Sequence, residues 1–146
     1  MSGRHPRRKK NAGRFAMLPV TVLNTDAVIT LSHAAHRVMV LLAAEYNGGN
    51  NGALGITANQ AIARGIGSDH TLYRALRTLE KHGLIERTYP ASRVPPRPTM
   101  YLLTWLSVDD TNYSRKTRIP THIYRQWKPS NSTTKTTPKV RLHAVQ

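Results

Sequence analysis

Residues 69–82 form the segment that most constrains this fold, because they carry an apolar side and a cationic side at helical spacing. At about 100° per residue, one side of a helix over this range gathers four apolar residues. These are Leu72, Ala75, Leu76 and Leu79. The opposite side holds His70, Tyr73, Arg74, Arg77 and Lys81. The pattern predicts a helix that packs on a core by its apolar side and exposes its cationic side.

Local signals mark both ends of this helix. Ser68 is a favoured N-cap residue, and Gly83 is typical of the position just past a helix C-terminus. Like charges four residues apart, as in Arg77 and Lys81, destabilise an isolated helix by about 0.2–0.5 kcal/mol. An anionic partner would explain why the chain keeps them. A solvated surface helix is the alternative, and this segment alone leaves both open.

The net charge of +15 is concentrated at the two ends of the chain. Residues 1–14 and 111–146 hold six and eight basic residues with no acid, whereas residues 15–110 hold eight basic residues and all seven acids. We expect two basic flexible arms, 1–14 and 107–146, on a nearly neutral domain. Such arms suit nucleic acid better than a membrane, since neither has an apolar stripe; solubilising tails are the alternative. The expected non-specific phosphate contacts are Arg4, Arg7, Arg8, Lys9, Lys10 and Arg14.

Composition argues against several other classes of protein. The chain has no cysteine for a disulfide or a thiolate metal site, and its longest apolar run, residues 38–44, is too short to span a membrane. The basic start is not followed by the apolar region of a signal peptide. No phosphate loop, nucleophile elbow or metal-ligand spacing is present. We therefore expect no enzyme activity, no cofactor or metal, no evident small-molecule ligand, no membrane partner and a cytoplasmic location.

The remaining segments give a coarse order of elements. Residues 15–30 are expected to be an extended lead-in, residues 32–47 a helix capped by Ser32, and residues 52–57 a short strand. A capping box, Thr57 to Gln60, opens a helix that stops before Gly65. Residues 84–90 and 99–106 read as two strands joined by a Pro-rich loop, 91–98. The C-terminal tail is expected to be mostly flexible. Residues 118–129 are an exception, because Tyr124 and Trp127 can dock on the domain or stack on a base.

This order resembles the winged helix-turn-helix family over residues 31–106. The resemblance is closest in "IGSDHTLYRALRTLEKHGLIERT", and "LSHAAHRVMVLL" with "YNGGNNG" is similar to small helix-turn-helix proteins of bacterial phages, plasmids and integrated elements. It implies an α+β, mainly α fold over residues 15–106, with three helices and a β-hairpin wing.

The resemblance also implies roles for named residues. The helix 69–82 would be a recognition helix in the DNA major groove, with Asp69 favouring its dipole or accepting a bond from a cytosine amine. Candidates for base edges are His70, Thr71, Tyr73 and Arg74. Candidates for the backbone or the adjacent minor groove are Ser68, Arg77, Lys81, Arg93 and Arg97.

Three functions fit these expectations. The first is sequence-specific binding of double-stranded DNA by a transcriptional regulator of a bacterial mobile element, which is associated with the nucleoid and expected to bind as a homodimer. The second is an origin-binding replication protein of a phage or plasmid, for which residues 118–129 could recruit a partner. The third is an RNA- or ribosome-associated basic protein. In that case aromatic side chains on a sheet or loop would be needed for stacking, and Tyr89, Tyr101 and Trp105 are more simply packing residues.

Overall fold

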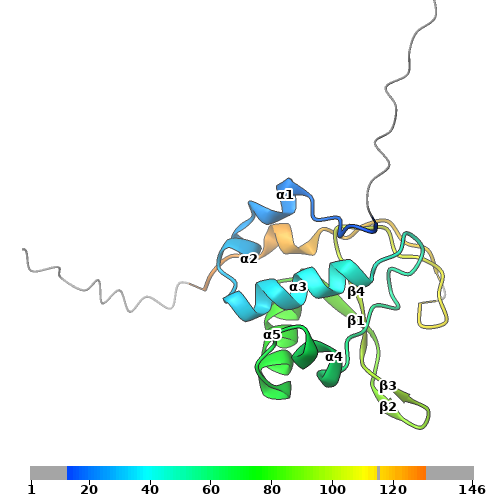
Figure 1. Cartoon of the computed structure of the whole chain (residues 1–146). Helices are drawn as coiled ribbons and strands as arrows, with labels where there is room; N and C mark the ends of the chain where they lie inside the picture. The colour runs from blue at the N-terminus through cyan, green and yellow to red at the C-terminus, as the bar shows by residue number, and fades with distance from the viewer. Residues whose placement is uncertain (1–12, 115, 131–146) are drawn as a thin grey trace, which may run out of the picture.

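The computed structural model describes residues 13–114 and 116–130 and shows an α+β architecture (Figure 1). The helices are α1 (Val20–Leu23), α2 (Asp26–Ile29), α3 (His33–Glu45), α4 (Ala58–Ala63), α5 (Asp69–Lys81) and the 3-10 helix η1 (Ile123–Gln126). The strands are β1 (Ile85–Tyr89), β2 (Ser92–Arg93), β3 (Pro96–Arg97) and β4 (Met100–Leu103). None of the helices in these two ranges has the length and apolar content needed to cross a membrane.

Helix α3 contributes six buried residues to the core. Ser32 caps it by accepting the N–H of Ala35 at 3.2 Å. Its buried side chains include Val38, Met39 and Leu42, and they pack against the apolar side of α5. The capping box of α4 is also present, with both hydrogen bonds between Thr57 and Gln60 formed. The helices expected over residues 32–47 and from Thr57 are thus confirmed.

Helix α5 has the boundaries that its sequence predicts. Ser68 accepts the N–H of Thr71 at 3.1 Å, and Asp69 accepts that of His70 at 2.7 Å. At the other end Gly83 adopts φ +73°, and the N–H groups of Gly83 and Leu84 reach back to the last turn of the helix. A Cβ on Gly83 would lie 3.0 Å from the backbone nitrogen of Tyr124, so the C-terminal segment packs closely there.

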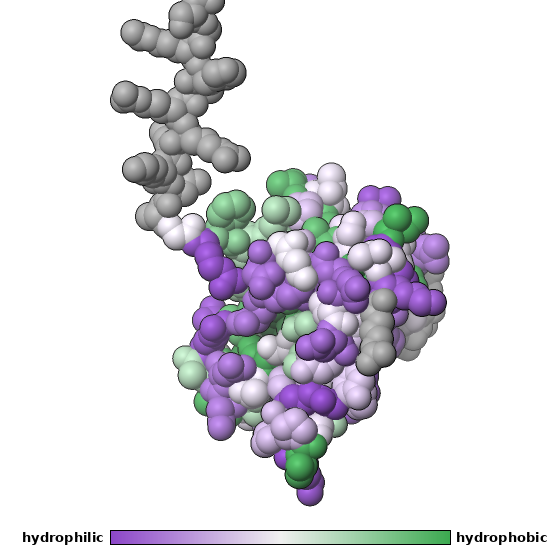
Figure 2. Space-filling model, turned by 90° about the vertical axis from the view of Figure 1, so that its right-hand side faces the viewer, coloured by the Kyte–Doolittle hydropathy of each residue, from purple (hydrophilic) through white to green (hydrophobic). Residues whose placement is uncertain are grey.

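The strands form one long antiparallel hairpin in two pieces. Strand β1 pairs with β4, and after an irregularity between Arg87 and Tyr89 the short strands β2 and β3 pair at the tip. Residues 91–98 were expected to be a loop without strands, so β2 and β3 are a correction. In this second piece Ser92 lies opposite Arg97, and Arg93 lies opposite Pro96. The hairpin tip projects below the body and carries hydrophobic surface (Figure 2). Val94, which lies between β2 and β3, is 89% exposed.

The expected strand over residues 52–57 is reduced to a single β-bridge. Leu54 exchanges two backbone hydrogen bonds with Tyr101, at 2.7 and 3.1 Å, and no further pairing follows within the described chain. Gly55 explains how closely this segment approaches the hairpin. A Cβ at that position would lie 2.9 Å from both the Met100 sulfur and the ring of Pro98.

The expected extended lead-in over residues 15–30 is wrong, because this segment contains the two short helices α1 and α2. The β-branched residues that suggested an extended chain are used instead to bury Val22 and Val28 in the core. Pro19 immediately precedes α1, where its fixed φ of −60° is compatible with starting a helix. Tertiary burial therefore outweighs the local strand preference.

The buried core continues past residue 106, where the sequence suggested a domain end. Val108 and Tyr124 are both buried, and Val108 exchanges backbone hydrogen bonds with Arg118. Asn51, which is fully buried, links the turn after α3 to this region through hydrogen bonds to the backbone of residues 103–107. The two ends of the described chain lie on the side of α1, α2 and η1, away from β2 and β3 (Figure 1).

Candidate nucleic-acid interface

The outward side of α5 carries a continuous set of cationic and aromatic side chains. The buried residues of the helix are the four apolar ones, so its opposite side is turned to solvent. The exposed set comprises His70, Tyr73, Arg74, Arg77 and Lys81. Asp69 is also exposed, and its carboxylate is bonded to the first turn of the helix, where a negative charge is favourable. The structure thus brings these predicted site residues together on one surface.

The acids of the domain neutralise cations elsewhere and leave this surface positive. Four ion pairs form within the described chain: Glu45 with Arg64, Glu80 with Arg87, Glu86 with Arg118 and Asp26 with Lys128. None of them includes Arg74, Arg77, Lys81 or Arg93. These four cations also make no side-chain hydrogen bond to another described residue. Exposed ion pairs add little stability, but here they decide where uncompensated charge remains.

A polar groove of about 430 Å³ runs along one flank of α5. Hydroxyl groups dominate its lining, together with the side chain of Arg74; the hydroxyl-bearing residues are Thr30, Ser32, Thr71 and Thr78. Thr71 is turned toward the helix cap, because its hydroxyl lies 3.0 Å from that of Ser68. Sequence reasoning did not identify Thr30, Ser32 or Thr78 as groove residues. Thr30 and Ser32 are far from α5 in the chain, so only the packing of α3 on α5 places them here.

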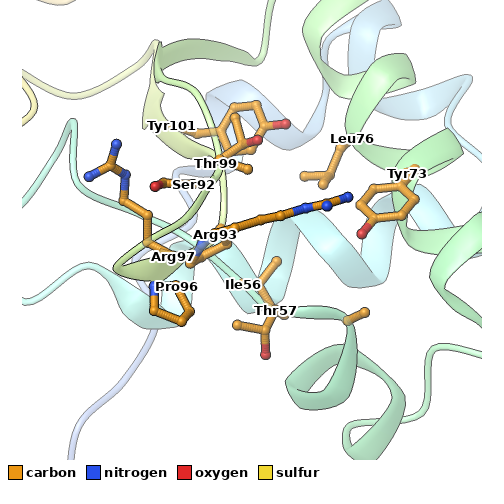
Figure 3. A pocket seen from close by; sticks show the side chains of 13 residues that line it. Ile56, Thr57, Tyr73, Leu76, Ser92, Arg93, Pro96, Arg97, Thr99 and Tyr101 are labelled. Carbon is orange, nitrogen blue, oxygen red and sulfur yellow. The ribbon is translucent and has the colours of Figure 1, made fainter.

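A second groove, of about 460 Å³, separates α5 from the hairpin. Figure 3 shows Arg93 extending across it toward Tyr73. Leu76 and Ile56 form part of its wall, and Tyr101 lines it with a side chain that is almost fully buried. Burial raises the pKa of the Tyr101 hydroxyl, and the nearby charge of Glu80 adds to this effect. Helix α5 is thus a ridge between two grooves, one lined mainly by hydroxyl-bearing residues and one lined mainly by apolar residues.

Arg97 also lines this groove, but its guanidinium does not extend across it as that of Arg93 does. In the β2–β3 register Arg97 lies opposite Ser92, and Arg93 lies opposite Pro96. The side chains of Arg97 and Arg93 therefore project from opposite faces of the hairpin. Its guanidinium points away from α5 (Figure 3) and stacks over Tyr89 at 4.2 Å and Tyr113 at 5.6 Å. Arg97 thus contributes to the packing of the hairpin.

Arg14 also has a structural contact that the sequence did not suggest. Its guanidinium donates to the carbonyl oxygen of Ala44 at 3.0 Å, near the C-terminal end of α3. Arg37 donates in the same way to the carbonyl of Arg64, just past the end of α4. Such contacts satisfy carbonyl groups that a helix end leaves unpaired. The other expected phosphate contacts of the N-terminal arm, Arg4, Arg7, Arg8, Lys9 and Lys10, lie outside the described residues.

Comparisons with protein-family models, with curated proteins and with solved structures found no match to this chain. The geometry and charge of the described residues are therefore the basis for a functional proposal.

Proposed function

We propose that this protein binds double-stranded DNA in a sequence-specific manner as a winged helix-turn-helix protein. In this proposal α5 is the recognition helix and the hairpin is the wing. The observation that carries it is the cationic ridge of α5, where Arg74, Arg77 and Lys81 have no acidic partner within the described chain while four other cations are paired. A surface that keeps uncompensated charge on a protruding helix is suited to a polyanion with a matching groove.

The dimensions of the ridge support a duplex as the partner. An α-helix with its side chains is about 10–12 Å across, and the major groove of B-DNA is about 12 Å wide. When such a helix lies in the groove, the sugar-phosphate backbones pass along its flanks. The polar groove suits one backbone, because the cation of Arg74 lines it and the Ser32 hydroxyl, which accepts the Ala35 N–H, keeps its own proton to donate.

Position along α5 divides the residues by role. His70, Tyr73 and Arg74 lie in its first two turns, nearest the base edges, and the fork of an arginine fits guanine in a bidentate manner. Arg77 and Lys81 lie further along and are assigned to phosphates. Thr71 and Ser68 are assigned to the cap of α5 rather than to DNA contact, since their hydroxyl groups already contact one another at 3.0 Å.

Among DNA-binding roles, we favour a transcriptional regulator of a mobile element over an origin-binding protein. The origin-binding alternative would use residues 118–129 to recruit a partner. In the structure Tyr124 is 2% exposed and Trp127 stacks on His82, so this segment packs on its own domain. The RNA-binding alternative needs accessible aromatic faces on the hairpin. Tyr101 and Trp105 are buried, and Arg97 lies over one face of the Tyr89 ring, which is 39% exposed, so the hairpin offers part of one ring only, which argues against it.

A competition experiment tests this proposal. Labelled duplex DNA bound to the full chain is challenged with duplex DNA, single-stranded DNA and duplex RNA of the same length at one salt concentration. We expect duplex DNA to compete best. Equal competition by duplex RNA would contradict the assignment, because the deep and narrow major groove of RNA does not admit the helix. A palindromic site selected from random duplexes would further indicate that the protein binds as a homodimer.

A further inference from the structure

The groove between α5 and the hairpin has walls that do not suit a sugar-phosphate backbone. Its apolar lining consists of Ile56, Ala58, Leu76, Ala91, Pro96 and Pro98. A backbone offers phosphate oxygens, which gain nothing from such walls, whereas the flat face of a nucleobase gains from leaving water. The polar groove on the other flank of α5 already provides the cation of Arg74 and the hydroxyl of Ser32 for a backbone. The two flanks are therefore adapted to different parts of a nucleic acid.

The polar groups that recognise a nucleotide are at the edge of this groove. Tyr73 is 53% exposed, which leaves a face of its ring available for stacking. Arg93 extends toward it across the groove (Figure 3) and has no ion pair with any described residue. A ring and a guanidinium in this arrangement match a base and its phosphate. The groove volume, about 460 Å³, falls in the range of pockets that bind small organic ligands.

Two of the hydroxyl groups in the lining, those of Thr57 and Ser92, already bond to the protein backbone. The Thr57 hydroxyl accepts the N–H of Gln60 at 3.2 Å, as part of the helix cap. The Ser92 hydroxyl is occupied with the backbone of Val94 at 3.2–3.3 Å. Recognition by stacking alone accepts any base, since every base has a flat aromatic face.

We propose that this groove binds one unpaired nucleotide of the DNA that α5 engages, with its base on Tyr73 and its phosphate on Arg93. This inference rests on the proposed function. Within a regular duplex the faces of each base are covered by its neighbours, so only a bulged, mismatched or opened nucleotide can enter. The protein would thus recognise duplex sequence with α5 and a local opening with the groove between α5 and the hairpin.

The test compares the affinity of the full chain for two duplexes that carry its selected site. One is fully paired, and the other has a single 2-aminopurine bulge, moved stepwise through the base pairs next to the site. We expect one bulge position to bind about tenfold more tightly than the paired duplex, with quenching of the 2-aminopurine fluorescence by stacking. Tyr73→Phe should keep this preference and Tyr73→Leu and Arg93→Ala should lose it. Arg125→Ala, on the far side of the domain in η1, is the matched charge control and should keep it.

The variants separate stacking from simple flexibility. A bulge also makes DNA easier to bend, which can raise affinity without any contact to the extra base. A preference that persists in Tyr73→Leu would therefore overturn the inference, as would equal affinity for paired and bulged duplexes at every position. In both cases sequence-specific binding of the paired duplex would leave the proposed function intact. Absence of any duplex binding would refute both proposals.

Discussion

The imidazole of His82 stacks on the indole of Trp127, with ring centroids 3.8 Å apart and an angle of 25° between the planes. His82 follows α5 directly, and its Nδ1 donates to the carbonyl oxygen of Ala27 in α2 at 2.7 Å. One side chain thus joins the end of α5 to α2 and to the C-terminal segment. The orientation of α5 therefore depends on residues on both sides of it in the chain.

Truncating this contact should destabilise the domain. Trp127→Ala removes the ring that covers His82 and part of the core, and we expect a loss of about 2 kcal/mol in the free energy of unfolding. Chemical denaturation followed by circular dichroism measures it. Arg125→Ala, in the same segment and exposed, should change stability by less than about 0.5 kcal/mol. Equal stability of the Trp127→Ala variant and the wild type would show that the stacking of Trp127 on His82 does not support the fold.

Asn51 is predicted to be among the most sensitive polar residues of the domain. Its amide and backbone N–H bond to the carbonyl oxygens of Leu103, Leu106 and Ser107 and to the carboxylate of Asp109, and its Oδ1 accepts the Leu103 N–H at 2.7 Å. Asn51→Ala would leave buried donors and acceptors without partners, at a cost of about 3 kcal/mol. The thermal midpoint reports this loss. Asn24→Ala is the control, since Asn24 is exposed; similar effects of both substitutions would contradict the role of Asn51.

Stability at alkaline pH should depend on Tyr101. Burial, with a further contribution from Glu80, raises the pKa of its hydroxyl above the ordinary value of 10.0. The native state therefore holds this proton more tightly than the unfolded chain does. That contribution is fully present below the unfolded pKa and is lost as the pH rises through the native pKa. Urea midpoints at about pH 9 and about pH 11 should fall more steeply for the wild type than for Tyr101→Phe. An equal decrease of the urea midpoint in the wild type and in Tyr101→Phe would mean that the ionisation of other groups determines stability at alkaline pH.

The sequence predicted α5 well because its signals are local. The spacing of Leu72, Ala75, Leu76 and Leu79 defines the buried side, and the residues at both caps are adjacent to the helix. The exposed cationic side follows from the same geometry. These features need no knowledge of the rest of the fold.

The contacts that sequence reasoning missed connect residues far apart in the chain. Asn51 meets Leu103 across 52 positions, and Arg14 reaches Ala44 across 30. An Asn-Gly step reads locally as a turn, and a basic arm reads as solvated, so neither pattern reports its partner. The stacking of Arg97 on Tyr89 was missed for a similar reason, since the sequence does not show the irregular register between Arg87 and Tyr89.

The N-terminal arm should set the salt dependence of DNA binding. Replacing its first five basic residues by glutamine keeps the length of the chain; they are Arg4, Arg7, Arg8, Lys9 and Lys10. If each neutralises one phosphate, the slope of log K against log salt becomes shallower by about 4–5. Binding measured at four or more salt concentrations gives this slope. We expect sequence preference to stay the same, and an unchanged slope would mean that the arm does not contact DNA.

Selection of bound sites from random DNA duplexes, with the wild type and with Arg74→Ala, tests the central claim most directly. The account predicts that the wild type selects a defined site and that Arg74→Ala loses preference at one base position, at a cost of about 1–3 kcal/mol on that site. Lys81→Ala, assigned to a phosphate, should weaken binding to all sequences alike. Recovery of no preferred sequence by the wild type, or the same site with unchanged preference at every position for Arg74→Ala, would contradict the assignment of α5 as a recognition helix.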